Sequence, residues 1–270
     1  MLDRRTFVLG AAVTAVAATS VGTAHAAAPP AHATGAASLG GTPVTLARID
    51  GRWALLGDNG SVRTTTGLDN ADLVDLSDDG TRLVAAGSLA GDPVAALWTS
   101  TDGVTWHEAR RLHGTRSEFT AVTGTLALGS VVRHERAAEV RVAVRRTASG
   151  WTTTPVRGLA DGLLASALAT TPGGFVCASV DSAGTRVHTS ADGVAWSELP
   201  RVEGVAVRGL VATSGVVRWF GNEIAGSTPL TGVVGGSPSP AAVPADAKAL
   251  GVTGTRSAWL SGGRLLTTAI

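Results

Sequence analysis

The chain has 270 residues, and its 22 Lys and Arg side chains nearly balance its 21 Asp and Glu side chains. This balance argues against a polybasic surface that binds nucleic acid or membrane lipid, so we expect no nucleic-acid partner. The single cysteine, Cys177, excludes an internal disulfide. Its apolar neighbours predict a small buried side chain, with a nucleophile as the weaker alternative.

The first 26 residues have the features of an export signal. Arg4 and Arg5 precede a weakly hydrophobic stretch rich in Ala, Val and Gly, and Ala24-His25-Ala26 offers the small residues that a signal peptidase requires. The segment resembles a twin-arginine (Tat) signal peptide. An ordinary Sec signal that happens to hold two arginines is the alternative. We therefore expect a protein secreted through the Tat pathway, either released or associated with the cell wall.

The composition changes after this segment. Residues 27–41 are rich in Ala, Pro and Gly, and we predict a linker there. Over 42–270, short runs of Val, Leu and Thr alternate with turns of Gly, Asp, Ser and Pro, and no long stretch has a 3.6-residue apolar period. This pattern predicts one all-β domain. No apolar stretch after residue 26 is long enough to span a membrane, so we expect no membrane span in the mature chain.

Two kinds of repeat divide the predicted domain. Trp106, Trp151 and Trp196 follow one another at intervals of 45 residues. A glycine-led turn followed by a short apolar strand recurs at 51–57, 80–87, 124–132, 173–180, 215–221 and 254–262. A period of this length with several strands per repeat is typical of a β-propeller, in which each blade buries its faces against the neighbouring blades.

The six copies predict six blades. We expect full blades at 72–115, 116–160, 161–204 and 205–247. The ends of the chain, 42–71 and 248–270, are shorter, and each is expected to supply about three strands and help close the ring. A five-bladed ring, in which the two ends share one blade, is the alternative.

A heptapeptide pattern, Ser-x-Asp-Gly-Val-x-Trp, occurs at 100–106 and again at 190–196. It resembles, one residue shorter, the Asp-box of BNR-repeat propellers, which occur in sialidases and many secreted proteins. In that family the motif forms a turn between the third and fourth strands of a blade, away from the active site. Asp and Ser can accept hydrogen bonds from the backbone of such a turn, Gly can take a positive φ, and Trp can be buried beneath it. We assign this structural role to Ser100, Asp102, Gly103, Trp106, Ser190, Asp192, Gly193 and Trp196.

Sialidase activity is not expected, although the resemblance invites it. Sialidases of this family use a tyrosine nucleophile and three arginines that hold the substrate carboxylate, but this chain contains no tyrosine. The nearest match to the family's Arg-Ile-Pro signature is Arg48-Ile49-Asp50. Arg48 and Arg208 are the only arginines that we place on inner strands.

Polar residues in the loops between blades, and between second and third strands, are the candidate binding residues. They are Arg110, Arg111, His113, Arg116, His134, Glu135, Arg136, Asn222 and Glu223, with smaller contributions from Asp92 and Asp181. A basic group with His and Glu side chains can bind an anionic sugar or a carboxylate, and His134 with Glu135 could act as an acid/base pair. The alternative is that these loops are simply solvated.

Neither a metal nor a cofactor is expected. The histidines are scattered, no Cys-x-x-Cys or His-x-x-x-His occurs, and residues 75–80 lack the further ligands of a calcium loop. No nucleotide-binding glycine motif occurs either. Trp53, Trp98, Trp219 and Trp259 are predicted to pack in the core rather than to stack on sugars.

Two functions stay open. The first is a secreted, monomeric, non-enzymatic propeller that binds a protein, a glycan or the cell envelope through its loop face. The second is a hydrolase or lyase that acts on a polysaccharide through carboxylates or histidine in the same loops; a propeller that has lost an enzymatic activity is a third possibility. Two carboxylates facing each other about 5–10 Å apart near the ring axis would favour hydrolysis, and an apolar axial pocket would favour binding.

Overall fold

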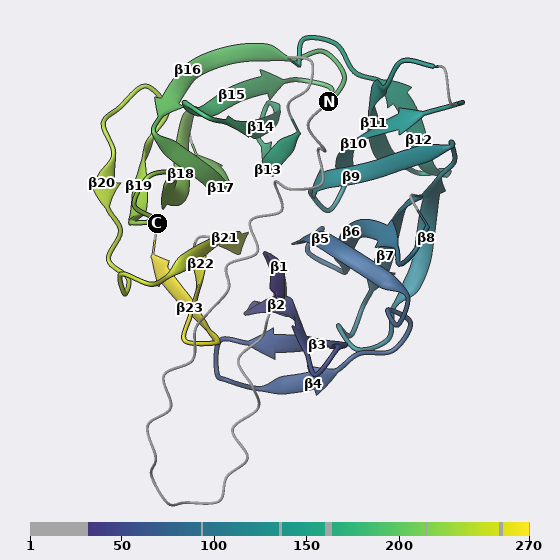
Figure 1. Cartoon of the computed structure of the whole chain (residues 1–270), viewed down its shortest axis with the longest axis horizontal. Coiled ribbons are helices and arrows are strands. Elements are labelled where there is room, and N and C mark those ends of the chain that lie inside the picture. Colours follow the sequence, from purple (N-terminus) through teal and green to yellow (C-terminus); the bar gives the residue numbers. More distant parts are fainter. Residues whose placement is uncertain are drawn as a thin grey trace, which may run out of the picture.

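The protein is a six-bladed β-propeller. The computed structural model describes residues 32–92, 94–134, 137–159, 164–213, 215–253 and 256–269, and these residues form strands and turns but no helix. Six antiparallel sheets surround a central axis, and each contains strands that are consecutive in the chain (Figure 1). The prediction of an all-β, six-bladed propeller is confirmed, and the five-bladed alternative is wrong because the two chain ends form separate sheets. Among the described residues there is no helix that could cross a membrane.

Each sheet begins with its innermost strand and continues outward. The first three blades contain β1 (His32–Leu39), β2 (Thr42–Ile49), β3 (Arg52–Gly57) and β4 (Val62–Thr64); β5 (Ala71–Asp78), β6 (Leu83–Leu89), β7 (Ala95–Ser100) and β8 (His107–Leu112); and β9 (Arg116–Val122), β10 (Leu126–Val132), β11 (Val140–Thr147) and β12 (Gly150–Pro155). The last three contain β13 (Ala165–Thr171), β14 (Gly174–Asp181), β15 (Gly184–Ser190) and β16 (Ser197–Glu203); β17 (Val205–Thr213), β18 (Val216–Glu223), β19 (Pro229–Val233) and β20 (Ser239–Pro240); and β21 (Lys248–Thr253), β22 (Arg256–Ser261) and β23 (Arg264–Ala269).

The innermost strands pack side by side around the axis. β1 contacts β5, β5 contacts β9, β9 contacts β13, β13 contacts β17, β17 contacts β21, and β21 returns to β1. Among the described residues no strand of one chain end pairs with the sheet of the other, so the ring closes between the first and last blades by packing. In this order β5 and β17, from the second and fifth blades, lie on opposite sides of the axis (Figure 1).

The first blade begins earlier than the composition predicts. Residues 32–39 fall in the expected linker, yet they form β1, whose central residues are buried. For these residues the linker prediction is wrong. Small residues suit β1 locally, because Ala36 and Ala37 are buried and a Cβ on Gly35 would overlap the Asp75 carboxylate of β5. The predicted export signal, 1–26 with Arg4 and Arg5, lies outside the described residues.

The core lies between the blades, and all four tryptophans outside the repeats are in it. Trp53 and Trp98 are each 3% exposed, and Trp219 and Trp259 are fully buried, which confirms the prediction that they pack in the core. Trp53 lies on the third strand of its blade, because β1 adds a strand before β2. Cys177 is also buried, and burial raises the pKa of its thiol.

The two heptapeptide turns have the same geometry. In the first, Asp102 Oδ1 accepts hydrogen bonds from the N–H groups of Val104 and Thr105 at 2.8 Å, and Ser100 Oγ accepts one from Gly103 at 2.8 Å. In the second, the equivalent three distances are 2.8, 2.9 and 2.9 Å. Trp106 and Trp196 are buried, and each indole N–H donates to the glycine carbonyl of its own turn at 3.1 Å. In both turns these hydrogen bonds and the buried tryptophan join the residues of the heptapeptide.

Each of these turns also fastens one blade to the preceding one. Thr66, which follows β4, exchanges two backbone hydrogen bonds with Val104 and Trp106 of the next blade. Arg157, which follows β12, makes the same pair of bonds with the second turn. The glycine after each, Gly67 and Gly158, has a positive φ and lies directly against a tryptophan carbonyl. The turns are therefore contacts between blades.

Candidate functional site

The predicted basic group lies along the junction of the second and third blades. Arg110 and Arg111 are in β8, the outermost strand of the second blade. His113 lies in the connection that follows, and Arg116 begins β9, the innermost strand of the third blade; both are exposed. Arg111 forms an ion pair with Glu108 at 2.6 Å, so its charge is already balanced. No contact among the described residues joins the four side chains into one site.

The other predicted residues are scattered around the ring. His134 is exposed in the turn after β10, and its predicted partners Glu135 and Arg136 lie outside the described residues. Asn222 lies in β18, where its amide donates to the carbonyls of Ser227 and Ala247 and accepts from Ala249 N–H at 3.0 Å. It thereby joins the fifth and sixth blades.

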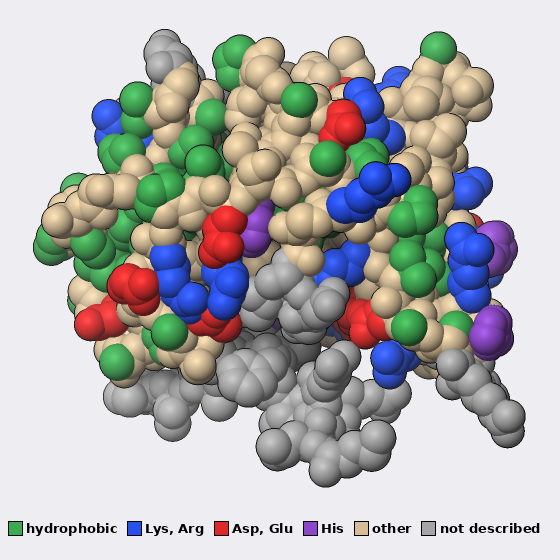
Figure 2. All heavy atoms as spheres, turned by 90° about the horizontal axis from the view of Figure 1, so that it is seen from above, with side chains coloured by type: hydrophobic (Ala, Val, Ile, Leu, Met, Phe, Trp, Pro, Cys, Tyr) green, Lys and Arg blue, Asp and Glu red, His purple; other side chains and the backbone are tan. Residues whose placement is uncertain are grey.

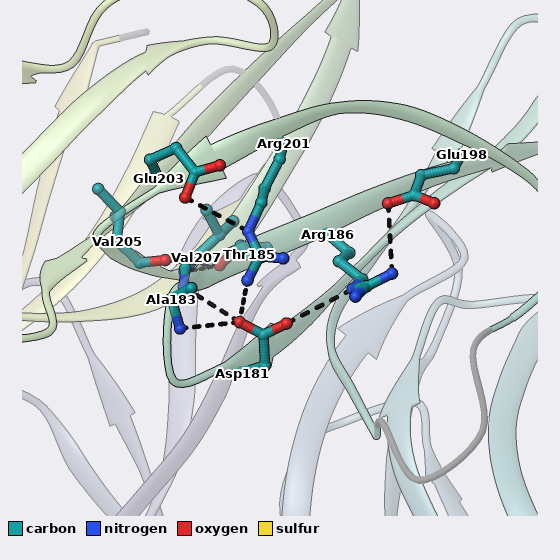
Figure 3. Close-up of polar contacts among 10 residues, drawn as sticks. Asp181, Ala183, Thr185, Arg186, Glu198, Arg201, Glu203, Val205 and Val207 are labelled. Atoms are coloured by element: carbon teal, nitrogen blue, oxygen red, sulfur yellow. Dashed lines mark hydrogen bonds and ion pairs between the residues drawn. The ribbon is translucent and has the colours of Figure 1, made fainter.

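Glu223 and Asp181 are likewise engaged with neighbouring groups. Glu223 accepts a hydrogen bond from the Thr228 hydroxyl at 3.0 Å. Asp181, at the end of β14, accepts hydrogen bonds from the N–H groups of Ala183 and Gly184 and forms ion pairs with Arg186 and Arg201 (Figure 3).

In the Asp181 cluster each of the two arginines forms ion pairs with two carboxylates. Arg186 also reaches Glu198 at 3.7 Å, and Arg201 reaches Glu203 at 3.5 Å (Figure 3). Burial alone would raise the pKa of Asp181, but the Ala183 N–H and the two arginines together lower it. An ionised aspartate between two arginines has no charge left for a ligand, so we assign this cluster to holding the blade together.

On the face drawn in Figure 2, Lys and Arg side chains of the described residues lie near Asp and Glu side chains in several places (Figure 2). The exposed large hydrophobic residues of the described chain are Val62, Val74, Leu164, Val216 and Ile224. They come from five different segments.

The most distinctive feature is a cavity of about 210 Å³ on the ring axis. All six innermost strands line it, through Ala36 of β1, 75–78 of β5, 122–123 of β9, 167–170 of β13, 208–211 of β17 and 250–252 of β21. Apolar residues are the most numerous among them, but polar atoms make up more of the accessible wall than apolar atoms do. The only charged residues among those that line it are Asp75, Asp78 and Arg208.

A β-bulge in every innermost strand shapes this cavity. Bulges insert extra residues into one strand of a pair and change the direction of the backbone. The inserted residues are Thr34 and Gly35, Val74, Thr120, Ser166, Arg208 and Leu250. The residues that follow them are Ala36, Asp75, Ala121, Ala167, Gly209 and Gly251. Five blades therefore have Ala or Gly where the second blade has Asp75.

Asp75 connects the second blade to its neighbour. Its carboxylate accepts hydrogen bonds from its neighbour Leu76 N–H at 2.9 Å and from Val122 N–H of β9 at 2.8 Å. Gly35 of β1 leaves room for it, because any side chain there would overlap the carboxylate. Burial raises the pKa of Asp75 to about 7, although both backbone donors and Arg208 favour the ionised form. Near neutral pH this carboxyl is therefore divided between its protonated and ionised forms.

Asp78, on the same strand, has a structural role as well. Its carboxylate accepts a hydrogen bond from Ser38 N–H of β1 at 2.8 Å and another from Gly80 N–H at 3.1 Å. It thus joins the second blade to the first, as Asp75 joins it to the third. Because both carboxylates come from β5, they do not face each other across the axis as those of a hydrolase would.

Arg208 differs from both carboxylates. Its side chain is accessible to water inside the cavity, and its guanidinium has no hydrogen bond or ion pair with another described residue. The surrounding protein lowers its pKa, and the opposite charge of Asp75 acts in the other direction. Since β17 lies across the axis from β5, Arg208 and Asp75 are on opposite walls of one cavity. Arg208 is the charged group in the cavity that the fold does not use.

The candidate binding residues named from sequence did not include Asp75 and Arg208. A signal was present, because aligning the six innermost strands gives a column of Ala and Gly that Asp75 interrupts. The alignment depends on the bulge positions, and only the strand pairing reveals them. No group of three potential metal ligands occurs among the described residues.

Comparison with known proteins supports the fold alone. No protein-family model matches the sequence, and no curated protein matches it significantly. Among solved structures, a gluconolactonase-like protein is similar at TM-score 0.55 and 12% identity, over 88% of this chain and 89% of that chain. A TolB-like protein from Agrobacterium tumefaciens is similar at TM-score 0.53 and 11% identity, over 77% of this chain and 79% of that chain. A chain of a nidogen–laminin complex is similar at TM-score 0.53 and 9% identity, over 77% of this chain and 77% of that chain. These neighbours, with different functions, place this chain among the six-bladed β-propellers.

Proposed function

We propose that this protein is an exported, non-enzymatic propeller that binds a small molecule, or the terminal group of a glycan, in its axial cavity. The observation that carries the proposal is Arg208, a cavity-lining guanidinium with no hydrogen bond or ion pair to another described residue. An accessible guanidinium that has no protein partner can donate its hydrogen bonds to an oxyanion, so a ligand can act as its partner. The site lies on the axis, inward of the loop residues named from sequence.

The way the carboxylates are used supports binding over hydrolysis in this proposal. Hydrolysis of a glycosidic bond requires two carboxyl groups on either side of the substrate. Asp75 and Asp78 come from one strand, and each already accepts two backbone hydrogen bonds. Neither is free to approach a substrate without giving up a contact between blades.

Export is proposed from the first 26 residues. Paired arginines before a short apolar stretch support the Tat pathway. The test is secretion of the protein from its host after replacement of Arg4 and Arg5 by Lys. Export through Tat predicts loss of extracellular protein, whereas unchanged secretion would favour the Sec alternative.

Binding in the cavity can be tested with a variant that fills it. Thr170 is exposed and lines the cavity, so Thr170→Trp should narrow it without displacing the core. Thr154→Trp, on the exposed outer strand β12, is the matched control. A glycan array and a metabolite panel screened by thermal shift should give ligands that the wild type and the control bind and Thr170→Trp does not. Equal binding by all three proteins would contradict the proposal.

A polysaccharide hydrolase or lyase is the second candidate, and one observation favours it. The pKa of Asp75, about 7, is suited to acid/base catalysis near neutral pH. Incubation with polysaccharides and measurement of new reducing or unsaturated ends would test it. Turnover that Asp75→Asn abolishes would replace the binding proposal.

A further inference from the structure

The axial cavity combines one positive group with a wall that is partly apolar. Arg208 is accessible inside it, and the partly exposed apolar side chains that line the cavity include Leu168, Val211, Leu250 and Val252. A guanidinium forms its strongest hydrogen bonds with oxyanions, and with a carboxylate it can form two parallel bonds. The apolar part of the lining can contact a ligand that carries hydrocarbon next to its charge.

The size of the cavity restricts the ligand further. Pockets that hold drug-sized ligands have volumes of roughly 300–1,000 Å³, and this one has about 210 Å³. A folded partner or an internal stretch of polysaccharide is therefore too large. A small molecule fits, as does a single terminal group.

We propose that the axial cavity binds a small organic carboxylate, with the carboxylate on the Arg208 guanidinium and the hydrocarbon part against the apolar part of the wall at Leu168 and Val252. This inference rests on the proposed function and specifies the chemical class of its ligand. A dianion is disfavoured, because Arg208 is the single positive group among the cavity-lining residues and Asp75 lies opposite.

The ionisation state of Asp75 determines the net charge of the cavity that the ligand enters. Of the elements packed against it, β1 contributes Gly35 and β9 contributes the Val122 N–H, and Arg208 is the charged side chain that acts on it. On its own strand, Asp78 is held by Ser38 and Gly80. An ionised Asp75 repels an anionic ligand and competes with it for Arg208. Carboxylate binding should therefore be stronger at pH 6 than at pH 8, and Asp75→Asn should bind equally at both.

The test compares two ligands that differ in charge but hardly in shape. Benzoate and benzamide are titrated by calorimetry into the wild type, Arg208→Gln and Arg208→Lys at pH 6. Arg218→Gln, an exposed arginine on β18 outside the cavity, is the matched control. Straight-chain carboxylates from acetate to octanoate follow on the wild type. Thermal melts of each variant establish that it is folded.

The inference predicts that benzoate binds at least about tenfold more tightly than benzamide, the effect of one charge-assisted contact. Arg208→Gln should abolish this preference, Arg208→Lys should keep part of it, and Arg218→Gln should leave it unchanged. Affinity should rise with chain length until the cavity is full. If Arg208→Gln fails to fold, the pH dependence of benzoate binding serves as the second test. The wild type should bind benzoate more tightly at pH 6 than at pH 8, and Asp75→Asn should lack this difference.

Three results would overturn the inference. Equal binding of benzoate and benzamide would show that charge is not recognised, and so would benzoate binding that Arg208→Gln leaves unchanged. In both cases the cavity could still bind a ligand, so the proposed function would stand if Thr170→Trp abolishes binding. Absence of binding by every carboxylate up to 10 mM, on the order of the weakest affinities that calorimetry resolves, would exclude the ligand class. The proposed function would then depend on the metabolite and glycan screens alone.

Discussion

Asp75 is the residue whose ionisation most affects the fold. Its folded-state pKa of about 7 lies above the ordinary value of 3.8, so between these values the folded protein holds a proton that the unfolded chain has lost. The contribution of Asp75 to stability is thus fully present below about pH 4 and is lost as the pH rises through about 7. The physical cause is burial in the axial cavity.

Replacing Asp75 by Asn tests this directly. We expect the free energy of unfolding of the wild type to decrease between pH 4 and pH 8 by an amount on the order of a few kcal/mol. Asp75→Asn should lack most of this decrease, because its side chain does not titrate. Urea denaturation followed by tryptophan fluorescence at several pH values measures both. Parallel pH profiles for the two proteins would contradict the assignment.

Gly67 and Gly158 are the glycines on which the contacts between blades depend. Their φ values are 82° and 81°, and a Cβ on either would overlap a tryptophan carbonyl oxygen. We expect Gly67→Ala and Gly158→Ala each to lower the free energy of unfolding by more than about 2 kcal/mol, the backbone cost plus the overlap.

Gly91 is the matched control for this prediction. Its φ is 78°, and a Cβ there would have nothing within 4 Å. Gly91→Ala should therefore carry only the backbone cost, about 1 kcal/mol. Urea denaturation of the three variants separates the two effects, and equal losses in all of them would show that the overlap is unimportant.

At the scale of the element, the turn between β7 and β8 depends on an ionised Asp102. Its hydrogen bonds from the N–H groups of Thr105 and Val104 lower its pKa from 3.8 to about 2. The stability that it contributes is present above about pH 4 and is lost as the pH falls through about 2. Asn can accept the same hydrogen bonds without titrating.

We therefore expect Asp102→Asn to fold and to lose less stability than the wild type between pH 4 and pH 2. Asp102→Ala, which removes the acceptor, should be destabilised at every pH. Urea midpoints measured across this range distinguish the three proteins. An Asp102→Asn midpoint that falls with pH as steeply as that of the wild type would refute the role of the charge.

The join between the fifth and sixth blades depends on Asn222. Its amide donates hydrogen bonds to two carbonyls and accepts one from an N–H group, so Asn222→Ala removes all three hydrogen bonds. We expect a loss of about 1–3 kcal/mol, against a negligible loss for the exposed control Asn70→Ala. Asn222→Asp should also be destabilised, because a carboxylate cannot donate. Thermal melts compare the three, and a neutral Asn222→Ala would contradict the assignment.

At the scale of the whole molecule, the sequence predicts the repeating unit well. The spacing of Trp106, Trp151 and Trp196 indicates the blade length, and four predicted blades coincide closely with observed sheets. The Ser-x-Asp-Gly turns are local, so their hydrogen bonds follow from the residues themselves. Local interactions of this kind can be predicted from one sequence.

The axis could not be predicted in the same way. β1 has the composition of a linker, because a strand that packs closely against β5 uses the same small residues as a flexible segment. The opposition of Asp75 and Arg208 depends on ring order and on bulges in two strands far apart in the chain. Such long-range geometry has no local signature, and for that reason the loop residues were more conspicuous than the cavity.

The central claim is that the axial cavity binds a carboxylate through Arg208. A crystal structure of the protein grown with benzoate tests it most directly. We predict the carboxylate group inside the ring, within hydrogen-bonding distance of the Arg208 guanidinium, with its ring against the apolar part of the wall. Benzoate bound only on the outer loops, with Arg208 in a direct ion pair with Asp75, would contradict it.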